Sequence, residues 1–440
     1  MSGLIKADSL GDILKVFRTE PLNKSEFAKF YYDKTMPIRT GDESTSPIYD
    51  LYDECSLPLT KNAHLLMGHG GSGKSTELFN LKQRLEENAQ PTHIIDFMAS
   101  TDSINADHWD MMLLISEGLC EIAKEHNLSV PDKTLSAVIN YLTDDVETKK
   151  DAGISTEAGV EAGITAKAPG ILSVLSVFAS IRSEIKASTS SRTTITKKME
   201  KRASEWIRYI QEISDWVMKG LSGKQPVLIF ENIDKYQPPD KALEILRYQY
   251  LSELPFPIIY TFPISLCYSP GFAAIEGNYK PHILPMIKTS NADKSDSPEG
   301  VSVIREIVKL RANEALFDER ALDNLIKQTG GVLRDLFECI ISAARRAERR
   351  GSNVIEAEDG ARALADLGER RSRLISMQDN DKLVNIYNDS RYREQIEDLQ
   401  FLLEKMQGLV VLEYRNGHRW HNLHPMIAQY LKDQGVIKET

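Results

Sequence analysis

The chain has 440 residues, of which 41% are hydrophobic and 27% charged, and its formal net charge at pH 7 is −10. These values are ordinary for a folded globular chain of about two to four domains, and the negative charge argues against a molecule that binds nucleic acid over its whole surface. No apolar run reaches the ~18 residues that a membrane-spanning helix needs. Because the first residues also lack the pattern of a signal peptide, we expect a cytoplasmic protein without a membrane span. We expect reduced, buried thiols rather than metal ligands at the four widely spaced cysteines, Cys55, Cys120, Cys267 and Cys339.

In chain order, residues 1–50 are expected to be peripheral and partly helical, with an exposed loop over 37–47. Alternating apolar runs and amphipathic stretches then predict a helix-like piece over 48–59, strand 63–67, helix 75–87, strand 93–97 and helix 108–126. Strands alternating with helices indicate a parallel α/β sheet with helices on both faces.

Residues 144–198 interrupt this pattern. A stretch rich in Gly, Ala, Ser and Thr (153–170) precedes the apolar run ILSVLSVFASI (171–181) and a polar run. We interpret the segment as an insertion, a β-ribbon or a short amphipathic helix. A surface excursion, a contact for oligomerisation or a partner, and membrane contact all stay open for it.

The pattern resumes with a long helix over 199–218 and with continuous apolar strands at 226–230 and 257–261, which are typical of central parallel strands. From about 300 the chain is predicted helical. Near the end, helix 391–406, two strands around Asn416-Gly417 and a last helix suggest a winged-helix unit. The expected domains are a peripheral segment (1–50), a phosphate-binding α/β domain (51–295), a helical lid (296–365) and a winged-helix-like domain (366–440).

The most specific motif lies between the first predicted strand and its helix. The run Gly68-His69-Gly70-Gly71-Ser72-Gly73-Lys74-Ser75 fits G-x-x-x-x-G-K-[ST], the phosphate-binding loop. Its glycines let backbone N–H groups face phosphate oxygens, and the following helix adds its positive N-terminus. We expect Lys74 to reach the β- and γ-phosphates, Ser75 to bind Mg²⁺, and Thr76 to lie near the α-phosphate of ATP or ADP.

A second magnesium element is expected where the strand VLIFENID ends. Glu231 would hold Mg²⁺ through water, and Asn232 stands where an acid would activate the attacking water. Because an amide cannot accept that proton as a carboxylate does, either Asp234 takes the role or hydrolysis is slow. The alternative is a buried strand followed by solvated acids.

Two polar residues further along are candidate sensors of the nucleotide. Thr261 ends the next predicted strand, where it could touch the γ-phosphate or form a local hydrogen bond. Arg334, in TGGVLRDL, could swing onto the γ-phosphate or pair with Asp335. The basic runs 345–350 and 370–373, and the hairpin with Arg415, His418, Arg419 and Trp420, could contact nucleic acid. Interleaved acids make a solvated face or a subunit contact the alternative for the basic runs, and packing against the neighbouring helices is the alternative for the hairpin.

Taken together, GHGGSGKSTEL, IFENID, IIYTFP and TGGVLRDL resemble the AAA+/STAND group of signalling ATPases, with an order and spacing similar to bacterial members and to origin-recognition-type initiators. The resemblance implies that Lys74 and Ser75 bind phosphate and magnesium. It places Glu231 and Asn232 at the second-motif acids, and Thr261 and Arg334 at the two sensors. WHNLHPMIAQYL is also similar to the Met-His-Asp segment of immune receptors, which implies that His424 contacts the β-phosphate of ADP, although Leu423 and Pro425 replace the flanking residues.

Three functions follow as hypotheses. The resemblance implies an ATP-dependent switch that oligomerises and activates a separate effector, as bacterial members do in anti-phage defence, with slow hydrolysis. An initiator- or loader-type ATPase that binds DNA through the winged helix is the second. A scaffold that uses bound nucleotide structurally, which Asn232 favours, is the third.

Overall fold

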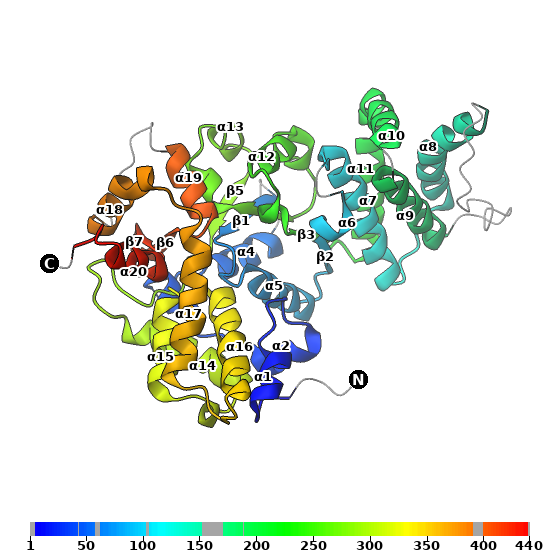
Figure 1. The fold of residues 1–440 in the computed structure, drawn as a ribbon. Coiled ribbons are helices and arrows are strands. Elements are labelled where there is room, and N and C mark those ends of the chain that lie inside the picture. The colour runs from blue at the N-terminus through cyan, green and yellow to red at the C-terminus, as the bar shows by residue number, and fades with distance from the viewer. Residues whose placement is uncertain are drawn as a thin grey trace.

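The computed structural model describes residues 5–42, 44–57, 62–102, 105–151, 170–187, 189–389 and 399–438. Its centre is a five-stranded, fully parallel sheet with the strand order β2-β3-β4-β1-β5 (Figure 1). The strands are β1 (Ala63–Gly68), β2 (Thr92–Asp96), β3 (Val227–Glu231), β4 (Ile258–Pro263) and β5 (Lys280–Ile283). The first four confirm the sequence-based expectation, whereas β5 was not predicted.

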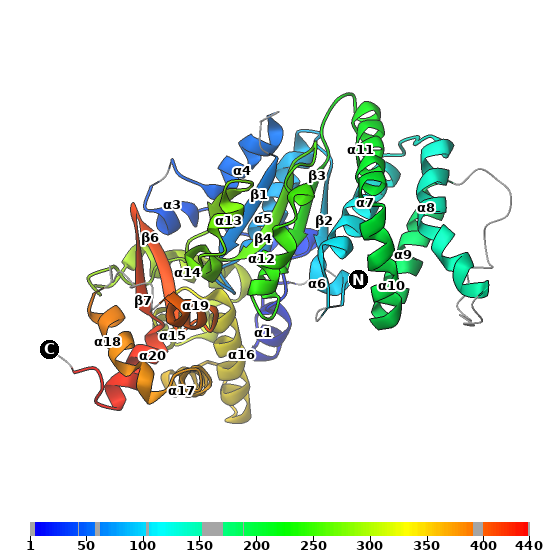
Figure 2. The ribbon, with the colours of Figure 1, turned by 90° about the horizontal axis from the view of Figure 1, so that it is seen from above.

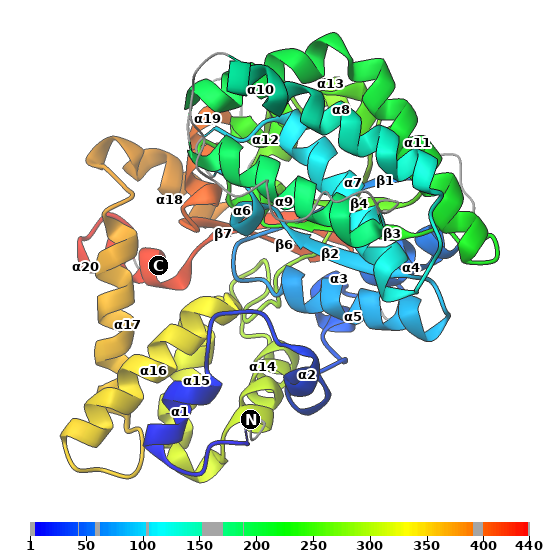
Figure 3. The same ribbon diagram turned by 90° about the vertical axis from the view of Figure 1, so that its right-hand side faces the viewer.

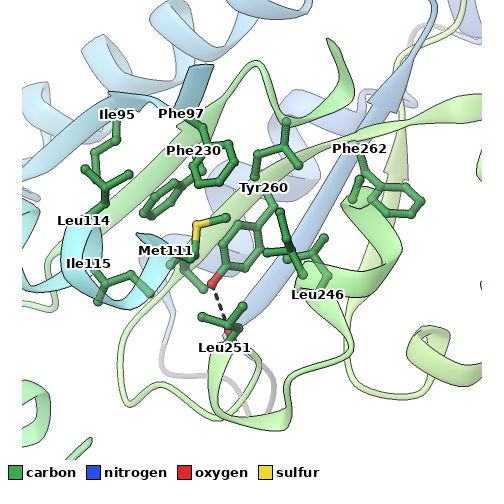
Figure 4. Close-up of a cluster of buried hydrophobic side chains, with 14 of the residues drawn as sticks. Ile95, Phe97, Met111, Leu114, Ile115, Phe230, Leu246, Leu251, Tyr260 and Phe262 are labelled. Atoms are coloured by element: carbon green, nitrogen blue, oxygen red, sulfur yellow. Dashed lines mark hydrogen bonds between the residues drawn. The ribbon is translucent and has the colours of Figure 1, made fainter. Parts of the chain in front are cut away.

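Helices cover both faces of the sheet, which explains why its strands are apolar throughout. On one face Leu66 and Ile229 pack against α4 (Pro47–Ser56) and α5 (Lys74–Glu87). On the other face Phe230 and Tyr260 pack against α7 (His108–Glu125) and α12 (Asp240–Leu246), and the Tyr260 hydroxyl donates to the Leu251 carbonyl at 2.9 Å (Figure 4). Side chains alternate between the faces along each strand. The α/β fold predicted from the sequence is therefore confirmed.

The insertion expected over 144–198 is helical where the structure describes it. It forms α8 (Asp132–Asp151), α9 (Ile171–Ala187) and α10 (Thr189–Lys201), which with α11 (Ala203–Gly220) stand at the far end of the molecule from the C-terminus (Figure 1). Val174, Phe178, Ile181 and Ile185 recur at helical spacing and are buried, so the β-ribbon alternative is wrong for 171–187. The glycine- and alanine-rich stretch lies outside the described residues, apart from Gly170. The single helix predicted over 199–218 is divided between α10 and α11.

A helical domain follows the sheet and includes residues 7–17 from the beginning of the described chain. It comprises α14 (Pro298–Arg311), α15 (Glu319–Gln328), α16 (Leu333–Arg349) and α17 (Ala357–Ser372), and α1 (Leu10–Val16) packs beside α16 (Figure 3). The Ala7 N–H donates to the Arg311 carbonyl at 2.8 Å, and the rings of Phe17 and Phe337 meet edge to face at 5.3 Å. The expectation of a peripheral segment is wrong here, because Ala7 and Phe17 are fully buried in the core of this domain.

The C-terminal unit is a winged helix, as predicted. It contains α18 (Asn380–Asn388), α19 (Leu399–Gln407), the antiparallel hairpin of β6 (Val411–Asn416) and β7 (His418–Leu423), and α20 (Pro425–Asp433). The first half of the helix predicted over 391–406 lies outside the described residues. Figure 2 shows the hairpin beside α3 (Met36–Thr40) and the sheet. Within the described ranges no helix is long and apolar enough to cross a membrane, and all four cysteines are free thiols.

Candidate nucleotide-binding site

The phosphate-binding loop lies between β1 and α5, in the context its motif requires. Gly71 and Gly73 have φ angles of +79° and +98°, which favour glycine. A Cβ atom on Gly71 would also come within 2.9 Å of the Arg334 Cβ. The loop therefore needs glycine both for its backbone conformation and for the close approach of the lid. Gly70, Gly71, Gly73, Lys74, Ser75 and Thr76 line a cavity, and Gly68, His69 and Ser72 are not among its lining residues.

Lys74 is the centre of the polar contacts at this loop. Its Nζ donates to the carbonyls of Gly68 at 2.7 Å and His69 at 3.0 Å, and it forms an ion pair with Asp234 Oδ2 at 2.9 Å. Burial opposes ionisation of Asp234, but the Lys74 ammonium outweighs it and holds the pKa of that carboxyl below its usual range. Two predicted site residues that are 160 positions apart thus meet as an ionised pair.

Glu231 lies at the end of β3, beside the first turn of α5. Burial raises its pKa to about 7, although a hydrogen bond with Ser75 acts in the opposite direction. Its Oε1 atom is buried and lacks a hydrogen-bond partner among the described residues. The Glu231 carboxylate and the Ser75 hydroxyl are in contact. Both supply oxygen atoms, which are the ligands that Mg²⁺ prefers. The structure therefore brings together the two residues predicted to hold the metal.

The turn after β3 places two more predicted residues in the cavity lining. Asn232 has a φ of +68° and begins η1 (Ile233–Lys235), a conformation that asparagine tolerates better than most residues. Thr261 Oγ1 accepts from the Ile233 N–H at 3.1 Å and hydrogen-bonds to the Asp234 carboxyl. Asn232, Asp234 and Thr261 all line the same cavity as Lys74, so Thr261 also forms the local hydrogen bond that was its alternative role.

The lid helix α16 begins directly against the loop. The Leu333 N–H donates to the Gly71 carbonyl at 3.1 Å, and Arg334 lines the cavity. The ion pair considered for Arg334 and Asp335 is not the one that forms. Asp335 instead accepts from Arg371 at 2.7 Å, so the Arg334 side chain is left beside the loop.

His424 is not brought to this cavity, contrary to the implication of the immune-receptor likeness. Its Nε2 lies 3.3 Å from Asp335 Oδ2, and its Nδ1 accepts from the Met426 N–H at 3.2 Å as the cap of α20. Burial lowers the pKa of this imidazole despite the neighbouring carboxylate. These two contacts turn the ring toward the base of α16 and give His424 a structural role in the described conformation.

His69 turns away from the cavity and joins the loop to the hairpin. Its Nε2 accepts from the backbone N–H of Glu413 in β6 at 2.8 Å, so the ring proton is assigned to Nδ1. Burial lowers the pKa of His69 to about 4, and the neighbouring Glu413 does not offset this. Because β7 is the one strand that pairs with β6 among the described residues, the Glu413 N–H on the other side of β6 is free to reach the loop.

The N-terminal segment supplies functional residues that sequence reasoning missed. Arg39, in the stretch predicted to be an exposed loop, is buried in α3 and donates to the carbonyls of Ser72 at 2.8 Å and Pro285 at 2.6 Å. It therefore holds the phosphate-binding loop through the Ser72 carbonyl, and it also lines the cavity. Apolar side chains from α1, the segment after it, α2 (Lys24–Phe30) and the lid also line the cavity: Val16, Leu22, Phe30, Ile307 and Phe337. Such long-range pairings leave no local signal in a single sequence.

No protein-family model matches this chain, and no curated protein matches it. Similar solved structures include Cdc6p from Pyrobaculum aerophilum, at 12% identity and a TM-score of 0.36, covering 94% of this chain and 98% of that one. The Aeropyrum pernix ORC1 protein in complex with DNA has 12% identity, a TM-score of 0.37 and coverages of 88% and 92%. The ADP form of Aeropyrum pernix ORC2 has 11% identity, a TM-score of 0.38 and coverages of 94% and 96%. Identities and TM-scores this low say nothing about activity, which only the geometry of the site can indicate.

Proposed function

We propose that this chain is an AAA+-type ATPase that binds ATP and ADP with Mg²⁺ at residues 68–76 and hydrolyses ATP slowly. The observation that carries the proposal is the convergence of Lys74, Asp234, Thr261 and Arg334 on one cavity beneath a glycine-dependent phosphate-binding loop. Four separate parts of the chain, α5, η1, β4 and α16, supply these side chains.

The cavity has parts suited to each portion of a nucleotide. Loop N–H groups, the N-terminus of α5 and Lys74 would hold the phosphates. Ser75 lines the cavity, and Glu231, which is hydrogen-bonded to Ser75, is not among the lining residues. Together they would hold Mg²⁺, which neutralises phosphate charge when it is bound. The apolar lining that includes Phe30 and Phe337 offers a surface for the base.

Slow turnover is proposed from the groups available to activate water. Asn232 cannot accept a proton, and Asp234, the acid two residues after it in the cavity lining, is held in an ion pair with Lys74. A carboxylate that neutralises a lysine is a weaker base than a free one. Asp234 would be released for this role only when Lys74 turns to phosphate.

The contacts around the loop favour a switch over a passive scaffold. Gly71 is bonded to the lid, and His69 is bonded to the winged helix. A change in how the loop holds phosphate would therefore alter contacts in both C-terminal domains. In this proposal the ATP-bound form assembles into a homo-oligomer and signals to a separate effector protein.

The test is nucleotide binding and turnover by the full chain and by Lys74→Ala. Charge-assisted hydrogen bonds contribute about 1.5–3 kcal/mol, so affinity for ATP should fall at least roughly tenfold, and turnover should fall to background. Lys124→Ala, which removes an exposed lysine paired with Glu121, is the control and should behave as wild type. Equal binding by all three proteins would refute the proposal.

DNA binding is the second candidate, because Arg415, His418 and Arg419 are exposed on the hairpin. Two observations favour the first candidate. The hairpin tip packs on the same chain, with the Gly417 N–H donating to the Thr40 carbonyl at 3.3 Å. Arginines of the basic runs also pair with acids, as Arg346 does with Asp366, Arg370 with Glu338 and Arg373 with Glu369. Salt-dependent DNA binding that Arg415→Ala weakens would support the second candidate.

A further inference from the structure

Two histidines and a glutamate form a buried cluster at the edge of the sheet, away from the candidate nucleotide site. His64 lies near the start of β1, His282 in the edge strand β5, and Glu54 in α4. Since His64 is four residues before Gly68, the cluster is about 13 Å along the strand from the phosphate-binding loop. The register pairs Leu66 with His282, so both histidines point to the face that α4 covers.

The three side chains meet through one atom each. His64 Nδ1 lies 3.1 Å from Glu54 Oε2, His282 Nε2 lies 3.2 Å from the same oxygen, and the two nitrogens are 3.3 Å apart. Ligands bound about 2.0–2.1 Å from a tetrahedral zinc ion are themselves about 3.3 Å apart. The three atoms therefore occupy the corners of one face of such a tetrahedron.

Hydrogen bonds within the cluster do not give every polar atom of these three side chains a partner. Two facing imidazole nitrogens can share only one proton, and Glu54 Oε2 is buried without a hydrogen-bond partner among the described residues. The other carboxylate oxygen, Oε1, pairs with the Lys280 ammonium. A buried carboxylate oxygen without a donor is costly, and a cation at the centre of the triangle would remove that cost.

The types of donor atom also suit a metal. His64 is fully buried and His282 is 6% exposed, and neutral imidazole is the form that binds metals. Two imidazole nitrogens and one carboxylate oxygen are a donor set that zinc accepts, whereas Mg²⁺ and Ca²⁺ prefer oxygen ligands alone.

We propose that Glu54, His64 and His282 bind one divalent transition-metal ion of the zinc type, with a fourth position for water. The site would link α4 to the central strand β1 and the short edge strand β5. It is separate from the magnesium site of Ser75 and Glu231, and it does not depend on the proposed ATPase activity.

The test is Zn²⁺ titration of the full chain after EDTA treatment and removal of the EDTA, in a buffer that contains Mg²⁺. Wild type should bind one Zn²⁺ per chain, and Zn²⁺ should raise its thermal midpoint. His282→Gln and Glu54→Gln should each weaken binding at least tenfold and lose the thermal shift. The control is His93→Gln, which changes a partly buried histidine in β2 that lies 3.9 Å from Glu125 of α7. This variant should retain both the Zn²⁺ binding and the thermal shift.

Two outcomes would overturn the site: no Zn²⁺ binding by wild type, or equal binding by wild type, His282→Gln and Glu54→Gln. If the two site variants do not fold, the visible spectrum of Co²⁺ added to wild type decides. Intense absorption typical of four-coordinate Co²⁺ supports the site, and the weak bands of six-coordinate Co²⁺ contradict it.

Discussion

At the scale of single residues, Asn232 combines a backbone role with a chemical one. Its φ of +68° lets the chain turn at once from β3 into η1, which carries Asp234 to Lys74. Glutamate would be strained in this left-handed conformation, whereas aspartate tolerates it nearly as well as asparagine. The residue that limits proton transfer in the proposed mechanism is thus also a good fit to the turn.

Asn232→Asp should therefore raise the ATPase rate while leaving the fold intact. A positioned general base contributes about 10²–10⁴-fold, so we expect an increase in kcat of at least roughly tenfold. Steady-state phosphate release measures it, and Lys74→Ala combined with Asn232→Asp supplies the background. An unchanged rate in Asn232→Asp together with a lost rate in Asp234→Asn would instead make Asp234 the base.

At the scale of elements, the sequence predicts those whose pattern is local. The β1–loop–α5 unit follows from an apolar run and a spaced motif, and Asn416-Gly417 marks the hairpin. Strand β5 escaped prediction because it has four residues, including Pro281, which only an edge strand tolerates. Helix α3 was not predicted because its buried Arg39 lies among Pro, Gly and Asp residues. The partners of Arg39 are the carbonyls of Ser72 and Pro285, which are distant in the sequence.

The contact between the loop and β6 yields the prediction at this scale. His69→Phe removes the acceptor of the buried Glu413 N–H, and an unsatisfied buried donor costs about 1–3 kcal/mol. Hydrogen exchange should become faster at the Glu413 amide, and the free energy of unfolding should fall by about that amount. His418→Phe, at the exposed hairpin tip, is the control, and equal exchange at Glu413 in both variants would contradict the link.

At the scale of the whole molecule, buried neutral histidines set how stability depends on pH. Burial lowers the pKa of His64, His69 and His282 to about 4. The unfolded chain therefore binds more protons than the folded chain below pH ~6.5, and stability falls as pH falls from there toward 4. Glu231 acts in the opposite direction, because its pKa is raised to about 7 and protonation favours the folded state.

Burial also lowers the pKa of His93, His108 and His424, and it raises the pKa of the Glu77, Asp107, Asp110 and Glu117 carboxyls. We expect the histidines to set the sign, so the free energy of unfolding should be lower at pH 5 than at pH 7. Urea unfolding at the two pH values, in buffer with EDTA to keep metals away, measures the difference. Equal stability at both values, or greater stability at pH 5, would show that these imidazoles are not held neutral by the fold.

Arg39 of the N-terminal segment, Leu333 of the lid and Glu413 of the winged helix all contact the phosphate-binding loop that follows β1. We therefore expect a nucleotide bound at this loop to affect the whole molecule. Hydrogen exchange of β6 and β7 in the full chain, with Mg²⁺ and either ADP or a non-hydrolysable ATP analogue, tests this most directly. We predict different protection of the hairpin amides in the two states, and no difference in Lys74→Ala. Identical protection in both states, with both nucleotides shown to be bound to wild type, would show that the hairpin does not respond to the nucleotide.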